Sequence, residues 1–188
     1  MWTISEHKNW DQLVDKFSWV RDMQGVPQDP IFHAEGDVAI HTRMVLEALM
    51  NLPAYAQRSE QEREILFAAA LLHDVEKRST TMTDEAGNIR SPGHAMRGAM
   101  TARRLLYEEH APAFSLKESI VKLVRYHGLP LWVFEKPDPL KALYQASLEV
   151  DTALLCLLAR ADILGRICAD QDELLYRIDL FEAFCQEQ

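Results

Sequence analysis

The residues best suited to chemistry are His73 and Asp74, which directly follow the apolar run of residues 65–72. The run is rich in good helix formers, and Ser59 with Glu62 three residues later predicts a capping box at the start of this helix. An ionised carboxylate at the inner end of a buried helix must be paired, hydrogen-bonded or bound to a metal ion, because an uncompensated buried charge is very costly. A hydrogen bond between the two side chains would suffice, so the dipeptide alone leaves both explanations open.

Four more polar residues fall on apolar faces of other predicted helices. His41 and His127 follow apolar residues at helical spacing, and both are predicted to face inward. His94 lies near the start of its helix on the apolar side, and Asp162 lies in the most apolar helix of the chain. Each has an ordinary structural explanation, since an inward histidine is usually satisfied by a hydrogen bond and Asp162 has Arg166 one turn later.

Taken together, these residues favour a shared metal centre. Five predicted helices each direct a histidine or an aspartate inward, and independent burial of so many costly groups is unexpected. Imidazole and carboxylate are natural ligands of divalent transition metals, so one centre with one or two ions explains them all. The mixed donor set suits Mn, Ni, Co, Fe or Zn without selecting among them. The predicted metal ligands are His41, His73, Asp74, His94, His127 and Asp162.

The elements that must position these side chains are almost all helices. Turn residues between 84 and 88 predict a small hairpin near residues 80–90. Asp37 is a predicted helix N-cap, and Ser115 with Glu118 predicts a second capping box. The sequence thus predicts an all-α bundle of about seven to eight helices, most simply one domain over residues 1–188. The helices are expected at about residues 9–20, 38–52 (ended by Pro53), up to 73, 94–110, 116–127, 140–148, 151–168 and 172–184.

Composition is that of an ordinary globular protein, with 48% hydrophobic and 26% charged residues. No apolar run reaches the roughly 18 residues of a membrane span, and the N-terminus lacks a signal-peptide pattern, so we expect a cytoplasmic protein with no membrane partner. The net charge of −9 disfavours a broad basic groove, but not a nucleic acid whose end alone enters a pocket. Small buried roles are expected for Cys156, Cys168 and Cys185, and surface positions for His7 and His110.

The ligand residues resemble a known pattern. Their order along the chain resembles the signature of the HD-domain metal-dependent phosphohydrolases, an all-α superfamily, over roughly residues 30–170. The histidines at 94 and 127 resemble those of the members that hold two metals. The residues that carry the central signature are His41, His73, Asp74 and Asp162.

Two local segments narrow the resemblance. Residues 33–42 and 91–99 are similar to segments of the HD modules in bacterial tRNA nucleotidyltransferases. They are also similar to the HD modules of bacterial RNA end-healing enzymes, in which an HD phosphoesterase precedes a polynucleotide kinase. Glu76 departs from the pattern, since many relatives carry glycine in that turn. The chain has no Gly-rich phosphate loop ending in Gly-Lys-Ser/Thr, so kinase activity would need a partner polynucleotide kinase domain, fused or separate.

The resemblance implies a metal-dependent phosphoesterase that hydrolyses 2′,3′-cyclic phosphate and 3′- or 2′-phosphate ends of RNA or nucleotides. The chemistry needs a hydroxide, charge neutralisation and a stabilised leaving oxygen, which two ions roughly 3.5–4 Å apart supply by activating a water and clamping the phosphate. We expect Asp74 to bridge the ions, with His94 and His127 completing the second site.

Phosphate contacts are expected from residues that flank the ligands. Lys77 follows the central pair and would meet a phosphate as a point charge. His33 lies in a loop that reaches the open side, as a phosphate contact, a proton donor or a further ligand. Arg97 and Arg166 are candidates for the same contact, although an ion pair explains each at least as well. Glu35 is expected to support a ligand, and not to be one.

Some alternatives stay open at this stage. An HD-type nucleotidase acting on free (deoxy)nucleotides or a signalling nucleotide would use the same centre. A non-catalytic nucleotide-sensing HD module would keep the fold without turnover. Trp132 and Phe134 lie beside a Pro-rich connector and would either pack in the core, the more common role, or stack on a base at the pocket mouth.

Overall fold

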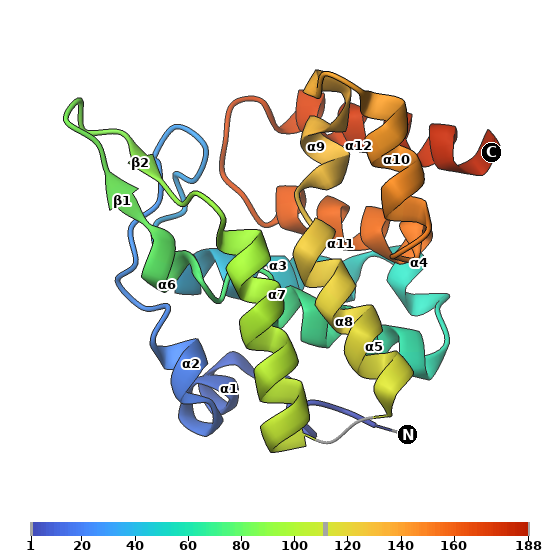
Figure 1. Ribbon diagram of the computed structural model, residues 1–188. Helices are drawn as coiled ribbons and strands as arrows, with labels where there is room; N and C mark the ends of the chain where they lie inside the picture. The colour runs from blue at the N-terminus through green and yellow to red at the C-terminus, as the bar shows by residue number, and fades with distance from the viewer. Residues whose placement is uncertain (1, 111–112, 188) are drawn as a thin grey trace.

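The computed structural model describes residues 2–110 and 113–187, and within these the chain is almost entirely helical (Figure 1). The predicted all-α class is confirmed, although short helices bring the number above the seven to eight that the sequence predicts. Eight of the described helices have seven residues or more: α1 (Trp10–Lys16), α3 (Val38–Asn51), α5 (Glu60–Leu72), α7 (His94–Leu105), α8 (Phe114–Tyr126), α10 (Pro139–Ser147), α11 (Thr152–Leu164) and α12 (Gln171–Glu187).

Short elements connect these helices. The hairpin expected near residues 80–90 is present as an antiparallel pair that aligns Met82 with Arg90 and Thr83 with Ile89. The remaining short elements are α2 (Ser18–Arg21), α4 (Pro53–Ala56), α6 (Lys77–Thr80), β1 (Met82–Thr83), β2 (Ile89–Arg90), a π-helical turn (Leu106–His110), α9 (Leu129–Trp132) and a 3₁₀ turn (Val133–Glu135).

The core is built around α5. Every residue from 64 to 72 is buried, and the helix packs against α3, α8 and α11. Figure 1 shows α7 and α8 side by side in front of it, and these two helices are in direct contact. α11 is buried at nine positions and also contacts α3 and α12, which agrees with its apolar sequence. The bundle therefore brings the ends of α5, α7 and α8 to one region of the core.

Helix caps account for several of these boundaries. Ser59 and Glu62 form the predicted capping box, with both reciprocal hydrogen bonds present. Asp37 caps α3 by accepting from the amide of Ile40 at 2.9 Å, and its other oxygen accepts from the amide of Gly25 at 2.7 Å. Because Asp37 ties the start of α3 to the preceding loop, it restrains the segment that carries His33.

The second predicted capping box is wrong. α8 begins at Phe114, and its N-cap residue Ala113 offers no side-chain acceptor. Ser115 lies inside the first turn, and Glu118 instead accepts two hydrogen bonds from Arg103 of α7, at 3.0 and 2.7 Å. The carboxylate pairs with a guanidinium across the helix interface because a charge-assisted bidentate contact is stronger than a hydrogen bond to a backbone amide.

Two local expectations also need correction, the uninterrupted helix over residues 9–20 and the surface position of His110. The helix expected over residues 9–20 is interrupted at Phe17, whose backbone is extended and whose ring stacks on Trp19 at 4.8 Å. α3 ends before Pro53 as expected, and Pro53 also begins α4, because proline is well tolerated in a first helical turn. His110 is half-buried and makes an edge contact with Phe17, whereas His7 is exposed as expected.

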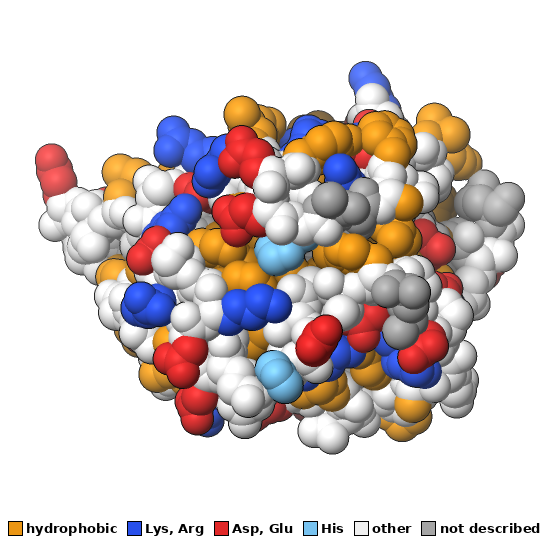
Figure 2. Space-filling view, turned by 90° about the horizontal axis from the view of Figure 1, so that it is seen from below, with side chains coloured by type: hydrophobic (Ala, Val, Ile, Leu, Met, Phe, Trp, Pro, Cys, Tyr) orange, Lys and Arg blue, Asp and Glu red, His pale blue; other side chains and the backbone are white. Residues whose placement is uncertain are grey.

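The face drawn in Figure 2 carries charges of both signs. Figure 2 shows Lys and Arg side chains interspersed with Asp and Glu across that face, and no broad basic groove crosses its described residues. Among the described residues, no single helix combines the length and apolar composition of a membrane span. α10 and α11 have that length and apolar composition only when they are taken together, as a pair bent by 112°. Cys156 is buried, while Cys168 and Cys185 are half-buried, and all three are free thiols.

Candidate metal centre

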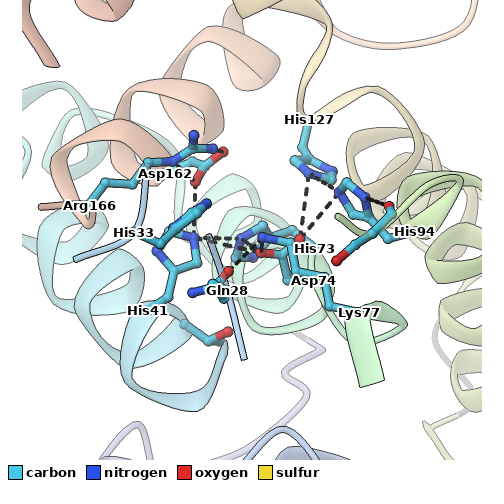
Figure 3. Close-up of polar contacts among 12 residues, drawn as sticks. Gln28, His33, His41, His73, Asp74, Lys77, His94, His127, Asp162 and Arg166 are labelled. Atoms are coloured by element: carbon cyan, nitrogen blue, oxygen red, sulfur yellow. Dashed lines mark hydrogen bonds and ion pairs between the residues drawn. The ribbon is translucent and has the colours of Figure 1, made fainter. Parts of the chain in front are cut away.

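Four histidines converge from three helix ends and one helix interior. His41 lies on α3, His73 and His127 are the C-cap residues of α5 and α8, and His94 is the first residue of α7. Figure 3 shows the four rings pointing toward one another around Asp74. His41, His73 and His127 are buried, and His94 is half-exposed. The residues predicted as ligands from separate helices therefore meet in space.

The backbone orients three of these rings in the same way. In each, Nδ1 lies within hydrogen-bond distance of the carbonyl oxygen three residues earlier. A carbonyl oxygen only accepts, so Nδ1 carries a proton and Nε2 is the atom that faces the centre, where a neutral ring offers its lone pair. The contacts are His73 Nδ1 to Ala70 O at 2.7 Å, His94 Nδ1 to Ser91 O at 2.8 Å, and His127 Nδ1 to Val124 O at 2.9 Å.

The fourth ring is oriented by Glu35. The Glu35 carboxylate accepts from Nδ1 of His41 at 2.9 Å, from Nδ1 of His33 at 2.8 Å and from the amide of Ile167 at 2.9 Å. Burial alone would raise the pKa of Glu35, but the hydrogen bonds from His33 and His41 outweigh it and hold the pKa well below its usual range. Glu35 is thus an ionised carboxylate that keeps the proton of His41 on Nδ1, as expected for a residue that supports a ligand.

Asp74 lies between the histidine pairs. Its Oδ2 is 3.2 Å from Nε2 of His73 and 3.7 Å from Nε2 of His41. Its Oδ1 is 3.4 Å from Nε2 of His94 and 3.8 Å from Nε2 of His127, and has no hydrogen-bond partner among the described residues. Burial would raise the pKa of Asp74, but Lys77 and His73 hold it well below its ordinary value, so the carboxylate is ionised.

This arrangement fits divalent cations. The Nε2 atoms of His41 and His73 are 3.4 Å apart, and those of His94 and His127 are 3.3 Å apart. Two unprotonated nitrogens that face each other repel unless a cation or a proton lies between them, and beside the His94 and His127 pair Asp74 Oδ1 is also unpartnered among the described residues. The ligand atoms lie within 4.8 Å of one another in two groups that share Asp74: His41, His73, Asp74 and Asp74, His94, His127.

Asp162 both faces the metal centre and pairs with Arg166, so the two roles expected for it are compatible. Its Oδ1 is 3.1 Å from Nε2 of His41, and its carboxylate also accepts two hydrogen bonds from Arg166, at 3.1 and 2.7 Å. Burial would raise the pKa of Asp162, but Arg166 and His41 hold it well below its ordinary value. Asp162 therefore lies at the edge of the His41 and His73 group as an ionised carboxylate.

Lys77 is held in place by a residue that sequence reasoning missed. Its Nζ donates to Asp74 Oδ2 at 2.8 Å and to Gln28 Oε1 at 2.7 Å, and both Lys77 and Gln28 are buried. Glu76 accepts from Thr101 at 2.9 Å and from Ser79, which anchors the turn that carries Lys77. Gln28 lies in a loop, where neither helical spacing nor a motif marks it, so no sequence signal could have found it.

Two cavities open onto this centre. One, of about 530 Å³, reaches Asp74; the other, of about 750 Å³, runs along the hairpin and the loop before α3. Both volumes lie in the range of cavities that bind whole small molecules. Burial lowers the pKa of His33 to about 4, although its hydrogen bond to Glu35 opposes this, so the ring is neutral near pH 7. The residues shared by both cavities are His33, Lys77, His94, Trp132 and Arg166.

Three expected residues lie differently from the rest. Arg97 is exposed on α7, one turn beyond His94, and lines neither cavity. We therefore do not propose it as a phosphate contact. Trp132 and Phe134 are 42% and 43% exposed, which corrects the expectation that both pack in the core. The turn after α9 directs both outward, and of the two only Trp132 lines the cavities at the metal centre.

Comparison with known proteins decides the family. The sequence matches the HD domain over residues 38–167, a segment that contains all six predicted ligands. The chain belongs to the HD domain family. HD domains are metal-dependent hydrolases that bind divalent ions, and the two histidine and aspartate groups are suited to hold them.

The curated relatives are longer proteins. The chain is 37% identical to the multifunctional CCA protein of Halorhodospira halophila over 103 residues, which is 55% of this chain and 22% of that protein. It is 28% identical to the multifunctional CCA protein of Pasteurella multocida over 182 residues, 86% of this chain and 38% of that protein. The chain therefore spans about two fifths or less of these relatives. The resemblance to the HD modules of tRNA nucleotidyltransferases is confirmed, and that to end-healing enzymes stays a prediction.

Proposed function

We propose that this HD domain is a metal-dependent phosphoesterase that hydrolyses 2′,3′-cyclic phosphate and 3′- or 2′-phosphate ends of RNA or nucleotides. One observation carries the proposal: the two oxygens of Asp74 face two different histidine pairs at the base of a cavity, with the Lys77 ammonium beside them. A carboxylate shared between two nitrogen-rich groups is the donor arrangement suited to a pair of divalent ions.

The residues that would hold the ions follow from the geometry. His41, His73 and Asp74, with Asp162 at their edge, form one group, and Asp74, His94 and His127 form the other. When bound, divalent ions would lower the pKa of water and neutralise charge on phosphoryl oxygens. The protein contributes an ionised bridging carboxylate and imidazoles whose Nδ1 protons are committed elsewhere, so their Nε2 atoms are free to ligate.

Lys77 and Arg166 are the proposed phosphate contacts. Lys77 Nζ is fixed between Asp74 and Gln28 and lines both cavities, so a phosphate at their junction lies within its reach. Arg166 also lines both cavities, and its pairing with Asp162 holds the guanidinium plane in place. A positioned cation stabilises the charge of a phosphate ester without reorganising during the reaction.

His33 is the proposed contact to the ribose hydroxyl next to the scissile bond, or to a phosphate oxygen. Its Nδ1 is held by Glu35, and its ring lines both cavities and packs edge-on against His41 with ring centroids 4.7 Å apart. This position lets the ring meet the hydroxyl next to the scissile bond, or a phosphate oxygen. Since Glu35 orients both His33 and His41, one carboxylate couples the substrate side of the site to its metal side.

Support for an RNA or nucleotide end comes from the size of the site and from the relatives. The cavities accommodate a nucleotide, and the matched relatives are named as CCA proteins. The test uses oligoribonucleotides and measures opening of a 2′,3′-cyclic phosphate to the monoester and release of phosphate from 3′- or 2′-phosphate ends, beside a panel of free nucleotides with Mn, Ni, Co, Fe or Zn. Asp74→Asn should abolish release, whereas Asp172→Asn, which changes an exposed aspartate of α12, should not.

Each outcome of this test separates the candidate functions. Release from RNA ends at rates above those for free nucleotides supports the proposal. Turnover of free deoxynucleotides or signalling nucleotides alone would favour a nucleotidase. No turnover with any metal, in a protein that still binds a nucleotide, would favour a sensing module and overturn the phosphoesterase proposal.

A further inference from the structure

The cavity of about 530 Å³ is lined by more positive charge than the metal centre uses. Four cationic side chains line it, whereas Asp74 supplies the single carboxylate among its described lining residues. This excess is notable in a chain whose net charge is −9, because the average surface of this protein is acidic. The four cations are Lys77, Arg125, Lys136 and Arg166.

Two of these cations are already paired and two are not. Lys77 pairs with Asp74, and Arg166 pairs with Asp162. In contrast, neither Arg125 nor Lys136 forms an ion pair within 4.0 Å among the described residues; Glu149, which interacts electrostatically with Arg125, is paired with Lys122. The Arg125 guanidinium lies over the Tyr126 ring, 5.6 Å from its centroid. Arg125 and Lys136 are therefore available to an anion in the cavity, whereas Lys77 and Arg166 serve the candidate metal centre.

The two pairs of cations lie at different depths. Asp74 and Lys77 are buried at the base of the cavity, whereas Arg125 is half-exposed and Lys136 is exposed. Arg125 comes from the last turn of α8, before His127, and Lys136 follows the 3₁₀ turn after α9. A phosphate at the base of the cavity would contact Lys77. A second anionic group nearer the opening would contact Arg125 and Lys136.

Trp132 supplies an aromatic surface in the same cavity. It lines both cavities and is 42% exposed. The guanidinium of Arg177 lies over its ring, 5.0 Å from the centroid, so a cation occupies one face while part of the ring stays exposed to the cavity. Base stacking on an aromatic ring contributes about 1–3 kcal/mol and tolerates every base. A nucleoside on Trp132 would carry one phosphate inward and another outward.

We propose that Arg125 and Lys136 bind a second phosphate of the substrate, on the 5′ side of the nucleoside whose 2′ or 3′ phosphate is hydrolysed. The preferred substrate is then a nucleotide phosphorylated on both sides of its ribose, as at an RNA end, and not a nucleoside monophosphate. This inference rests on the proposed function, because it assigns the reacting phosphate to Asp74 and Lys77. It also explains how an acidic protein accepts the end of a nucleic acid without a broad basic groove.

The experiment compares three substrates that share one reacting group. They are a nucleoside 2′,3′-cyclic phosphate, the same compound with a 5′-phosphate, and a dinucleotide ending in a 2′,3′-cyclic phosphate. The metal-loaded protein should show about tenfold higher kcat/KM for both compounds that carry the second phosphate, as expected for two partly exposed ion pairs. The 5′-phosphorylated mononucleotide and the dinucleotide together distinguish a free nucleotide from an RNA end as the source of that phosphate.

The variant Arg125→Ala/Lys136→Ala should lose this preference through a higher KM, while kcat/KM for the plain cyclic phosphate stays unchanged. The matched control is Arg104→Ala/Lys141→Ala, which removes the same charge from exposed positions that line neither cavity. The control should keep the preference, because the effect depends on position and not on net charge.

The outcomes separate this inference from the proposed function. Equal kcat/KM for all three substrates in the unaltered protein would overturn the second-phosphate site and leave the phosphoesterase intact. If no substrate is hydrolysed with any metal, the phosphoesterase proposal fails, and the same compounds then serve as ligands in a binding titration. Equal Kd values with and without the second phosphate would overturn the inference in that case as well.

Discussion

The Nε2 atoms of His94 and His127 face each other at 3.3 Å, although one residue begins α7 and the other ends α8. Each ring donates its Nδ1 proton to a carbonyl of its own chain segment, so neither nitrogen brings a proton to the contact. Antiparallel packing of α7 against α8 produces this pairing, because the start of one helix lies beside the end of the other. The Nε2 atoms of His41 and His73 also face each other, at 3.4 Å, although His41 lies inside α3 and its Nδ1 is held by Glu35.

The first prediction concerns metal content. His127→Gln should remove the ion of the group it shares with Asp74 and leave the other group loaded, while Asp74→Ala should empty both, since Asp74 belongs to each. Elemental analysis of the purified protein measures ions per chain. His7→Gln, at an exposed histidine, is the control and should match the unaltered protein. Unchanged metal content in Asp74→Ala would contradict the assignment.

The second prediction concerns Gln28, whose Oε1 accepts from Lys77 Nζ at 2.7 Å. Gln28→Leu removes this acceptor and frees the ammonium, so kcat should fall about tenfold, which is the effect of one hydrogen bond to a charged group. Gln28→Glu keeps an acceptor oxygen and should retain more activity than the leucine variant. Steady-state kinetics measure both, with thermal unfolding to show that each variant is folded. Equal activities of the two variants would rule out the positioning role.

The third prediction tests the contact between α3 and α11. A Cβ added at Gly165 would lie 2.6 Å from the backbone nitrogen of Val45, and the Gly165 carbonyl also lies 3.3 Å from Nδ1 of His41. Gly165→Ala should therefore cost about 1–3 kcal/mol of unfolding free energy, as overpacking does. Gly128→Ala meets no atom within 4 Å and is the matched control. Urea denaturation measures the unfolding free energy of both variants. Equal values would show that α3 and α11 move apart to accommodate the added methyl group at no cost.

The fourth prediction concerns stability at mildly acidic pH. Burial lowers the pKa of His110 below its ordinary 6.5, with Lys16 acting in the same direction and Glu109 opposing. The unfolded chain therefore binds the proton first as the pH falls, so the stability contributed by the neutral ring is complete above pH 6.5 and declines below it. His110→Gln should lose less unfolding free energy between pH 7 and pH 5 than the unaltered protein.

Chemical denaturation at a series of pH values measures this difference. His7→Gln should show the same decline as the unaltered protein, because that residue is exposed. A decline that is identical in His110→Gln would show that His110 titrates alike in the folded and unfolded chain. The edge contact of the ring with Phe17 makes overall stability a poor readout, so the slope with pH decides.

Signals confined to a few residues were enough to predict most of the fold. The capping box of Ser59 and Glu62, the N-cap Asp37 and the turn of the hairpin all appear as expected, because each depends on hydrogen bonds within a few residues. The failed cap at Ser115 has the complementary cause. Its expected partner Glu118 instead forms a bidentate ion pair with Arg103, fifteen residues away in the sequence. Helix packing brings these two residues together, so the sequence pattern does not show the contact.

The chain by itself also determined which residues would be costly to bury separately, and hence that histidines and aspartates from five helices should meet. Only the tertiary structure decided which oxygen of Asp74 faces which histidine pair, that Glu35 orients His33 and His41 together, and that Gln28 holds Lys77. It also turned Arg97 away from the cavities and left Arg125 and Lys136 unpaired within one. Burial costs belong to residue types and can be inferred from sequence, whereas contacts across 49 or 124 residues depend on how helices pack.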